Sequence, residues 1–304
     1  MIKKIFKYIL IIILFIFITG CNVSKNNNDE LVDYENDLKV YFINVGQADC
    51  SFIMLPNGEN ILIDAGLDHA TSFDESNFPS WNNIVDILTL ENIEIIDYVI
   101  VTHNHSDHYY YIDEIIKNYT VEGIYVSGST STNYTYLKLL ETIDEYNVPM
   151  YEVYSGQKII DEVSLTFQVL HTLKLNNPED ANICSVITKL TYINKSFLFM
   201  GDAGSTKNDG EIVLLKINAD IKSDVLKVGH HGSPYASSED FLKRVRPQYS
   251  VITTANITIT KHPYKSALDR LKKYSENILQ SKNDGTILFV CNGYELNLFT
   301  HIGE

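Results

Sequence analysis

One short segment concentrates side chains that bind metals. The stretch Thr102–His108 reads THNHSDH, and four of its positions carry imidazole or carboxylate groups: His103, His105, Asp107 and His108. Imidazoles and carboxylates are ligands that zinc, manganese and iron take in proteins. A polar surface turn is the alternative, but it does not explain so dense a cluster. We therefore interpret this segment as part of a metal site.

Two further polar clusters follow apolar runs elsewhere in the chain. Asp202 comes just after the run at 196–200, and the pair His230 and His231 comes just after the run at 224–228. Taken singly, each is compatible with a turn residue or a solvated loop. Because ligands gather beyond the carboxyl ends of strands in α/β folds, their shared placement predicts one site.

The elements that must position these side chains alternate between strand and helix patterns. β-rich runs at 40–45, 51–55 and 60–63 predict an N-terminal meander, and apolar spacing predicts a helix over 81–90. A buried strand over 97–101 leads into the histidine segment. Further helices are predicted over 109–117, 134–146 and 266–274, and another begins near Ser238, where a capping box starts at Ser237. Further strands are predicted over 164–170, 183–192, 196–200, 224–228, 249–253, 257–260, 286–290 and 295–300. This order predicts an α/β fold of layered sheets with the site along one edge.

The composition limits the classes of protein that the chain can be. Its 304 residues are 45% hydrophobic, which is enough for a substantial core and excludes a disordered chain. Lys and Arg number 24 against 39 Asp and Glu, so the formal net charge is -15. This balance disfavours proteins that coat nucleic acid electrostatically, because such proteins need clustered cations.

The first 21 residues carry an export pattern. Lys3, Lys4 and Lys7 precede an apolar run at 8–18, and Thr-Gly then leads to Cys21. A charged start and an apolar stretch this short are typical of a secretory signal. The ending resembles a bacterial lipobox, whose cysteine is lipidated and becomes the N-terminus; a retained signal anchor is the alternative. We expect an extracytoplasmic protein anchored to the outer face of the cell membrane as a lipoprotein.

The predicted domain organisation follows from that pattern. Residues 1–20 would be a signal peptide, 21–38 a flexible tether from lipidated Cys21, and 39–304 one globular domain. Removal of the signal deletes three lysines and no acids, which leaves a mature net charge of -18. The part of the chain that works outside the cell is therefore more acidic than the whole.

In its motifs the chain resembles the metallo-β-lactamase superfamily. The resemblance rests on the order of Asp64-Ala65-Gly66 after a strand, the His-x-His-x-Asp-His segment, a Gly-Asp turn and a late histidine. Within that superfamily, four motifs are similar to the hydrolase domain of ComEC-like competence DNA-channel proteins: NVGQAD at 44–49, FLFMGD at 197–202, LKVGHHGS at 226–233 and His262-Pro263. The same branch includes teichoic-acid phosphorylcholine esterases. The resemblance implies a single domain with a four-layer αββα sandwich.

The resemblance also implies two divalent metal ions, with zinc expected and manganese as the alternative. Its ligand set assigns His103 and His105 to the first ion, Asp107, His108 and His231 to the second, and Asp202 as a bridge between them. Asp64 would support the metal loop from behind. In this template a hydroxide shared by the ions attacks the electrophile, and Asp107 orients or deprotonates the water.

One position departs from the superfamily pattern. A histidine that normally gives the first metal a third protein ligand is replaced by Asn182, as is common in the competence-like branch. The first metal is therefore short of donors. His171 is an alternative donor, although a hydrogen-bonded histidine at a strand end is the simpler interpretation.

Three more residues complete the predicted site. Of the adjacent pair, His231 is assigned to the metal and His230 to the substrate or to a supporting contact, with the reverse assignment left open. His262 is a candidate general acid or phosphate contact, or else a plain loop histidine. Asp49 would brace the first hairpin near the metal loop.

These features favour an enzyme, because structural zinc sites are usually closed by four Cys or His ligands. The resemblance points to a phosphodiesterase or nuclease whose substrate is DNA, a nucleotide or a teichoic-acid-type polymer. It would contact the membrane through its lipid anchor, and no stable protein partner is implied. The alternatives are a phosphorylcholine esterase acting on wall polymers, a metal-binding regulatory protein without turnover, and a β-lactam or lactone hydrolase.

Basic side chains near the late motifs bear on the choice of substrate. They occur in two stretches, Lys243, Arg244 and Arg246, and Lys265, Arg270, Lys272 and Lys273. They could bind a polyanion, or they could be ordinary solvated helix faces. The acidic charge of the chain favours DNA as an active-site substrate over DNA as a coated polymer.

Overall fold

The computed structural model describes residues 24–25, 31–32, 36–67, 80–256 and 261–303. The chain divides into two compact units, Met1–Asn36 and Asp37–Glu304. In the first unit, β1 (Ser24–Lys25) pairs antiparallel with β2 (Leu31–Val32). The predicted signal peptide and Cys21 lie outside the described residues, as does most of the predicted tether. Within the described ranges, no helix combines the length and apolar character that crossing a membrane requires.

The first sheet of the second unit has eight strands. Their spatial order is β10, β9, β7, β5, β4, β3, β18 and β19. Their bounds are β3 (Leu38–Phe42), β4 (Ser51–Met54), β5 (Asn60–Ile63), β7 (Tyr98–Val101), β9 (Ile124–Val126), β10 (Met150–Glu152), β18 (Ile287–Cys291) and β19 (Leu296–Phe299). The predicted meander is the antiparallel run β3–β4–β5, and the predicted C-terminal hairpin adds to β3. From β5 outward the strands run parallel, so their carboxyl ends share one edge.

The second sheet has seven strands in simple sequence order from β11 to β17. Their bounds are β11 (Lys158–Asp161), β12 (Leu165–His171), β13 (Ile187–Tyr192), β14 (Lys195–Phe199), β15 (Val225–Lys227), β16 (Tyr249–Ile252) and β17 (Asn277–Gln280). The first four strands are antiparallel neighbours, and β14 to β17 are parallel. Strand β12 alternates buried and half-buried residues, the pattern of a strand with one face on the core.

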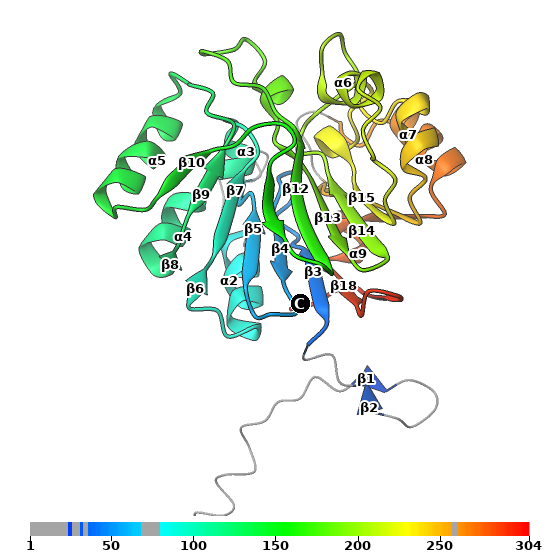
Figure 1. Cartoon of the computed structure of the whole chain (residues 1–304), viewed down its shortest axis with the longest axis horizontal. Helices are drawn as coiled ribbons and strands as arrows, with labels where there is room; N and C mark the ends of the chain where they lie inside the picture. The colour runs from blue at the N-terminus through cyan, green and yellow to red at the C-terminus, as the bar shows by residue number, and fades with distance from the viewer. Residues whose placement is uncertain (1–23, 26–30, 33–35, 68–79, 257–260, 304) are drawn as a thin grey trace, which may run out of the picture. The chain divides into compact units, whose positions relative to one another are not determined.

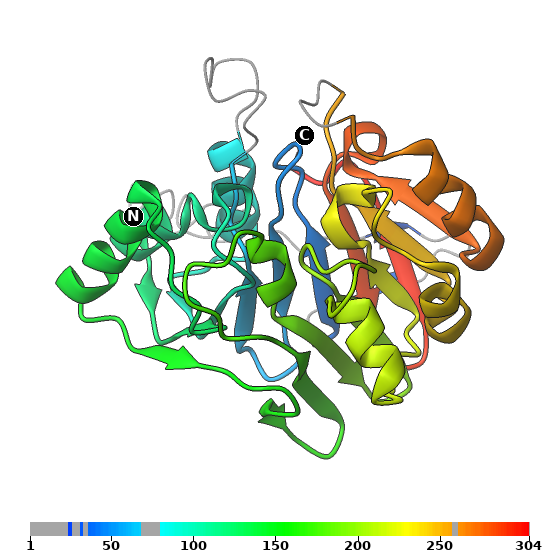
Figure 2. The ribbon, with the colours of Figure 1, turned by 90° about the horizontal axis from the view of Figure 1, so that it is seen from above.

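Helices cover the outer faces of both sheets. The helices are α2 (Ser80–Leu90), α3 (Ser106–Tyr109), α4 (Ile112–Asn118), α5 (Tyr134–Glu145), α6 (Gly210–Lys216), α7 (Glu239–Val245), α8 (Lys265–Tyr274) and α9 (Ser281–Asp284), with short 3-10 turns η2 (Ala181–Cys184) and η3 (Gly229–Gly232) and a small extra pair, β6 (Ile95–Ile96) with β8 (Thr120–Val121). Figure 1 shows α2, α4 and α5 outside the first sheet and α6, α7 and α8 outside the second. Figure 2 shows the same layers from above, with the strands between the two groups of helices. The predicted four-layer αββα sandwich is confirmed.

Among the described residues, two apolar clusters pack neighbouring layers against each other. The larger lies between the sheets and includes Phe42, Phe167, Phe197 and Phe289, all fully buried. The second packs the outer face of the second sheet against α6, α7 and α8, with Phe241 among its members. Burial of so many aromatic rings makes the sandwich a rigid support for the loops at its edge.

Some predicted element bounds are wrong for local reasons. The predicted strand over 183–192 begins as η2, because the Asp180 side chain accepts a bond from the backbone of Asn182 and starts a tight turn there. The cap of α7 is Ser238 and not Ser237, because Ser237 has a left-handed backbone with φ of 57°. The predicted helix over 109–117 is split into α3 and α4. The predicted strand over 257–260 lies outside the described residues.

Candidate metal centre

The metal-type side chains come from the ends of neighbouring strands in both sheets. Asp64 follows β5 and the histidine segment follows β7, which are adjacent in the first sheet. Asp202 follows β14 and His231 follows β15, which are adjacent in the second sheet. The end of the histidine segment, from Ser106, forms α3, which lies at the upper edge of the sandwich in Figure 1. Two sheet edges therefore supply one cluster.

Four donors converge closely enough to share an ion. Asp107, His108, Asp202 and His231 each offer an atom, and these atoms all lie within 4.8 Å of one another. Asp202 Oδ1 is 3.3 Å from His108 Nε2 and 3.6 Å from His231 Nε2, and His231 Nε2 is 3.5 Å from Asp107 Oδ2. We call Asp107, His108, Asp202 and His231 the converging set.

The converging set fits a bound metal. His108 Nε2, His231 Nε2 and Asp202 Oδ1 are buried and form no hydrogen bond among the described residues. Buried polar atoms normally have partners, so three orphaned atoms pointing to one place indicate a ligand. Tetrahedral zinc with ligands at about 2.1 Å separates those ligands by about 3.4 Å, which matches the spacing found here.

His108 is held in place by a buried carboxylate. Asp64 Oδ2 lies 2.7 Å from His108 Nδ1, and its carboxylate also accepts 2.8 Å bonds from the backbone and hydroxyl of Thr102. Nδ1 is thereby occupied and Nε2 is left for a metal, which is how carboxylates orient ligating histidines. A side chain at Gly66 would place its Cβ 1.7 Å from the Asp107 carbonyl oxygen, so only glycine lets this loop close.

His231 is also held through its Nδ1 atom, by Thr253 with a carboxylate behind it. Nδ1 lies 3.1 Å from both the carbonyl oxygen and Oγ1 of Thr253, and Asp49 Oδ1, which accepts from that Oγ1, is 3.4 Å from the same nitrogen. Asp49 also joins the two sheet edges, because its backbone N–H donates to the Asp107 carbonyl of the first sheet at 2.9 Å while its carboxylate accepts from Thr253, which follows β16 of the second. It therefore lies where the sequence prediction placed it, beside the metal loop.

Lys227 is a residue of this centre for which the sequence reasoning assigned no role. Its side chain is 2% exposed, and Nζ lies 2.6 Å from Asp49 Oδ2 and 3.0 Å from the Val228 carbonyl. A buried lysine needs such a partner, because desolvating an unpaired charge is costly. The signal for it was available: Lys227 is a charged residue inside an apolar strand, immediately before the ligand loop.

The loop that carries His231 has an unusual backbone. His230 and His231 have φ values of 47° and 49°, in the left-handed region. Each costs roughly 1–2 kcal/mol for a residue with a side chain. Gly229 precedes them where a Cβ would lie 2.4 Å from the Ala203 carbonyl oxygen. Strain of this kind persists where the surrounding fold enforces it, and here it turns His231 inward.

His103 and His105 lie beside the converging set but are held differently. His103 Nε2 is 3.1 Å from His105 Nδ1, and the ring of His103 is 4.1 Å from that of His108. Asn182, the departure from the superfamily pattern, lies 8% exposed with its Nδ2 3.4 Å from His230 Nδ1. Its Oδ1 has no partner among the described residues. We call His103, His105 and Asn182 the open set.

Charges in the centre are strongly coupled. Burial lowers the pKa of His108, but Asp202 and Asp64 outweigh it and raise that pKa well above its usual value. Burial raises the pKa of Asp202, but His108 and His230 bring it well below its usual value. Burial lowers the pKa of His103, with His108 adding to the effect. The residues therefore hold carboxylates ionised where a cation would bind.

Two cavities differ in their relation to this centre. One of about 440 Å³ is lined by residues that include His230 and His262. His230 Nε2 is 3.7 Å from Asp202 Oδ2, and the rings of His230 and His262 are 5.1 Å apart. The structure thus brings both predicted substrate-contacting histidines to the rim of the centre.

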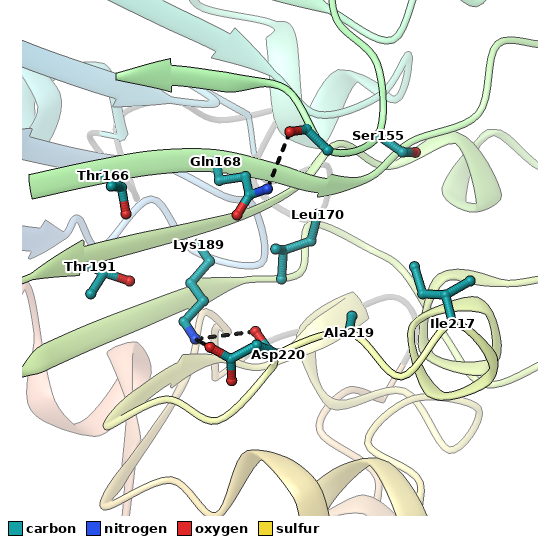
Figure 3. A pocket seen from close by; sticks show the side chains of 10 residues that line it. Ser155, Thr166, Gln168, Leu170, Lys189, Thr191, Ile217, Ala219 and Asp220 are labelled. Atoms are coloured by element: carbon teal, nitrogen blue, oxygen red, sulfur yellow. Dashed lines mark hydrogen bonds and ion pairs between the residues drawn. The ribbon is translucent and has the colours of Figure 1, made fainter. Parts of the chain in front are cut away.

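The second cavity, of about 520 Å³, lies on the outer faces of β12 and β13. Figure 3 shows Lys189 reaching Asp220 across it and Gln168 donating to the loop at Gly156. None of the predicted site residues lines it. Its charged side chains are already paired with each other, so it adds nothing to the centre.

The remaining predicted candidates do not join the cluster. His171 Nδ1 lies 3.5 Å from Ser155 Oγ, and no contact with the converging set is found among the described residues. In the basic stretches the lysines lie on solvated helix faces, where Lys243 pairs with Asp240, Lys265 with Asp269 and Lys273 with Glu239, whereas Arg244 and Arg270 donate to backbone carbonyls. Such exposed pairs neutralise the positive charge locally.

Comparison with known proteins agrees with this fold and centre. Residues 43–255 match the family described as the Metallo-beta-lactamase superfamily. ComE operon protein 3 of Bacillus subtilis is 27% identical over 258 residues, which cover 83% of this chain and 33% of that protein. Recombination protein 2 of Haemophilus influenzae is 26% identical over 252 residues, which cover 81% of this chain and 28% of that protein. The chain spans about a third of the length of these relatives.

A solved structure shows the same architecture. The match to the metallo-beta-lactamase fold protein YhfI from Bacillus subtilis spans 81% of this chain and 97% of that protein, with a TM-score of 0.52 and 11% identity. The predicted resemblance to competence proteins is confirmed by the curated relatives. With 213 consecutive residues matched, the chain belongs to the metallo-β-lactamase superfamily, and this membership supports a metal-dependent hydrolase.

Proposed function

We propose that this chain is an extracytoplasmic, lipid-anchored phosphodiesterase that uses two divalent metal ions, zinc in the first instance. The observation that carries the proposal is the converging set, whose orphaned nitrogens and oxygen surround one point beside a cavity with two more histidines. One matched relative is named as a competence protein and another as a recombination protein, which supports a phosphodiester substrate.

The metals and the protein would divide the chemistry. Bound divalent ions supply an activated water and stabilise the negative charge that develops on phosphate. Asp107 is the most exposed member of the converging set, with 21% of its side chain accessible, so its carboxylate can orient that water. Attack at phosphorus breaks the bond to the leaving oxygen, which must then take a proton.

His230 and His262 would contact the phosphate from the cavity side. Burial, together with His230 and His231, lowers the pKa of His262 to about 4, so its imidazole is neutral at pH 7. A neutral imidazole suits a hydrogen bond to phosphate better than proton donation to a leaving group. His230 is the more accessible of the two neighbouring histidines of its loop, with 32% of its side chain exposed.

The membrane address belongs to the proposal and rests on the sequence alone. We expect Cys21→Ala to release the protein from the membrane fraction or to leave it unprocessed. Fractionation and immunoblotting of cells that produce either form would test this. Membrane retention of the processed variant would refute the lipid anchor without affecting the metal centre.

The activity is tested by metal analysis together with hydrolysis of a simple diester. The zinc-loaded protein should contain two ions per chain and hydrolyse methyl p-nitrophenyl phosphate. Asp202→Ala should lose both properties, whereas the control Asp220→Ala, an exposed aspartate remote from the centre, should keep them. If the protein binds metal but hydrolyses no diester with any divalent ion, the non-catalytic interpretation is supported instead. Hydrolysis of nitrocefin or a lactone alone would identify a different member of the superfamily.

A further inference from the structure

The 440 Å³ cavity beside the centre carries side chains that the phosphate chemistry does not require. Besides the histidines, it is lined by Tyr235, Lys261 and Tyr264, with Ser233 and Pro234 between them. Tyr235 is 67% exposed and Tyr264 is 38% exposed. We call Tyr235, Lys261 and Tyr264 the tyrosine pocket.

Tyr235 is exposed but its backbone is firmly held. Its carbonyl accepts bonds of 2.7 Å from both the backbone and the hydroxyl of Ser205. Arg270 clamps the same loop by donating to the carbonyls of Pro234, Ala236 and Ser237 at 2.7–3.0 Å. A large aromatic side chain left in solvent on a rigid loop contacts a ligand at little cost in ordering entropy.

A chain of rings connects the tyrosine pocket to the converging set. The centre of the Tyr264 ring is 5.5 Å from that of the His262 ring, and the His262 ring is in turn 6.5 Å from the His231 ring, with an angle of 24° between their planes. His262 is 9% exposed, and its Nδ1 has no partner among the described residues. The His262 ring would therefore lie between a group bound in the pocket and a phosphate held at the centre.

The charge of the pocket separates two classes of phosphodiester. Among the described residues that line the cavity, Lys261 is the one side chain with a permanent positive charge, and no ion pair holds it there. Two tyrosine rings and a cation suit a planar base and its neighbouring phosphate. Tyrosines also attract quaternary ammonium groups, but the Lys261 charge repels them.

We propose that the tyrosine pocket is the subsite for the nucleobase of a nucleotide phosphodiester, with Lys261 on the phosphate side. This inference rests on the proposed phosphodiesterase activity and names the substrate class of that same site. It gives the chain selectivity for nucleoside esters over esters of choline or simple alcohols.

The test compares three esters that share one leaving group. These are thymidine 5′-(p-nitrophenyl) phosphate, methyl p-nitrophenyl phosphate and p-nitrophenyl phosphorylcholine, assayed with the zinc-loaded protein. We expect the highest kcat/KM for the thymidine ester. Tyr235→Ala and Tyr264→Ala should each lower the thymidine-to-methyl ratio by about 5- to 100-fold, the effect of losing one stacking ring. Tyr294→Ala, which removes a comparably exposed tyrosine from the β18–β19 turn, should leave the ratio unchanged.

Two results would overturn the proposal. One is an unchanged ratio in both tyrosine variants. The other is a preference for the choline ester that depends on the same tyrosines, which would assign the pocket to quaternary ammonium groups. If no ester is hydrolysed, the proposed function fails and calorimetry with thymidine 5′-monophosphate decides the pocket. Binding that weakens in Tyr235→Ala supports it, and no binding to the unaltered protein refutes it.

Discussion

The converging set and the open set lie side by side, yet the protein holds them in different ways. In the converging set, the Nδ1 atoms of His108 and His231 each face a buried carboxylate, and their Nε2 atoms form no hydrogen bond among the described residues. In the open set, His103 and His105 contact each other at 3.1 Å, and Asn182 stands where the superfamily pattern has a histidine. Ligands fixed by outer carboxylates bind metal more tightly. The difference predicts that one ion is bound tightly and the other weakly.

The largest expected effect comes from removing a converging ligand. His231→Ala should lose the tightly bound ion and lower phosphodiester turnover by about 100-fold or more, because charge stabilisation at the reacting phosphate is lost. His105→Ala should instead keep one ion per chain. Metal content by mass spectrometry and turnover measured on the same samples check this. Equal losses of metal in both variants would erase the distinction between the two sets.

The buried pair of Lys227 and Asp49 offers the next test. Lys227→Met leaves the Asp49 carboxylate uncompensated and should cost about 3–5 kcal/mol of unfolding free energy. Asp49→Asn combined with Lys227→Met removes both charges and should recover most of that stability. Because His231 then lacks its carboxylate partner, zinc affinity should still fall about 10- to 100-fold.

Urea denaturation and zinc titration of the same two variants separate these effects. Stability and metal affinity should therefore change independently. If the double variant recovered both, Asp49 would have only a structural role, and the support of His231 would have to come from Thr253.

A substitution in the open set should act in the opposite direction. Asn182→His restores the donor type that the superfamily pattern has at this position, and it should tighten the weaker ion by about 10-fold or more. Competition with a coloured zinc chelator measures this change, with Asn177→His on the nearby exposed loop as a control. No tightening would show that the position cannot reach the metal.

The smallest expected effect concerns the loop beyond His231. Glu211 accepts bonds from the backbone N–H groups of Ser237 and Ser238, and burial raises its pKa from 4.5 to about 7. The folded state therefore binds this proton more tightly than the unfolded state. Its contribution to stability is full below about pH 4.5 and is lost as the pH rises through 7.

The unfolding free energy of Glu211→Gln should therefore rise relative to that of the unaltered protein as the pH rises from 5 to 8. Chemical denaturation at several pH values measures the difference in unfolding free energy. A difference that stays constant with pH would show that Glu211 does not titrate in this range.

The sequence predicted the parts of this protein whose signals are local. The histidine segment after an apolar strand, Asp64 and the Gly-Asp turn at Asp202 each carry their meaning in a few adjacent residues. The layers followed from the alternation of periodic apolar runs. Strand β10 was not predicted, because all three of its residues are exposed and leave no apolar pattern.

Contacts between distant segments could not be predicted. In the sequence Lys227 is a single charged residue in a strand, and only the fold shows that Asp49 lies 2.6 Å from it. Tyr235 and Tyr264 read as ordinary surface residues, and only the fold places both at one cavity with His262. Pairing across sheets depends on the closure of the whole sandwich, which no short stretch of sequence encodes.

The most direct measurement of the central claim is a calorimetric titration of the full, chelator-stripped protein with zinc. We expect two binding steps of clearly different affinity, with the tighter step absent in His231→Ala and present in His105→Ala. Two equal steps, or a tight step that survives His231→Ala, would contradict it.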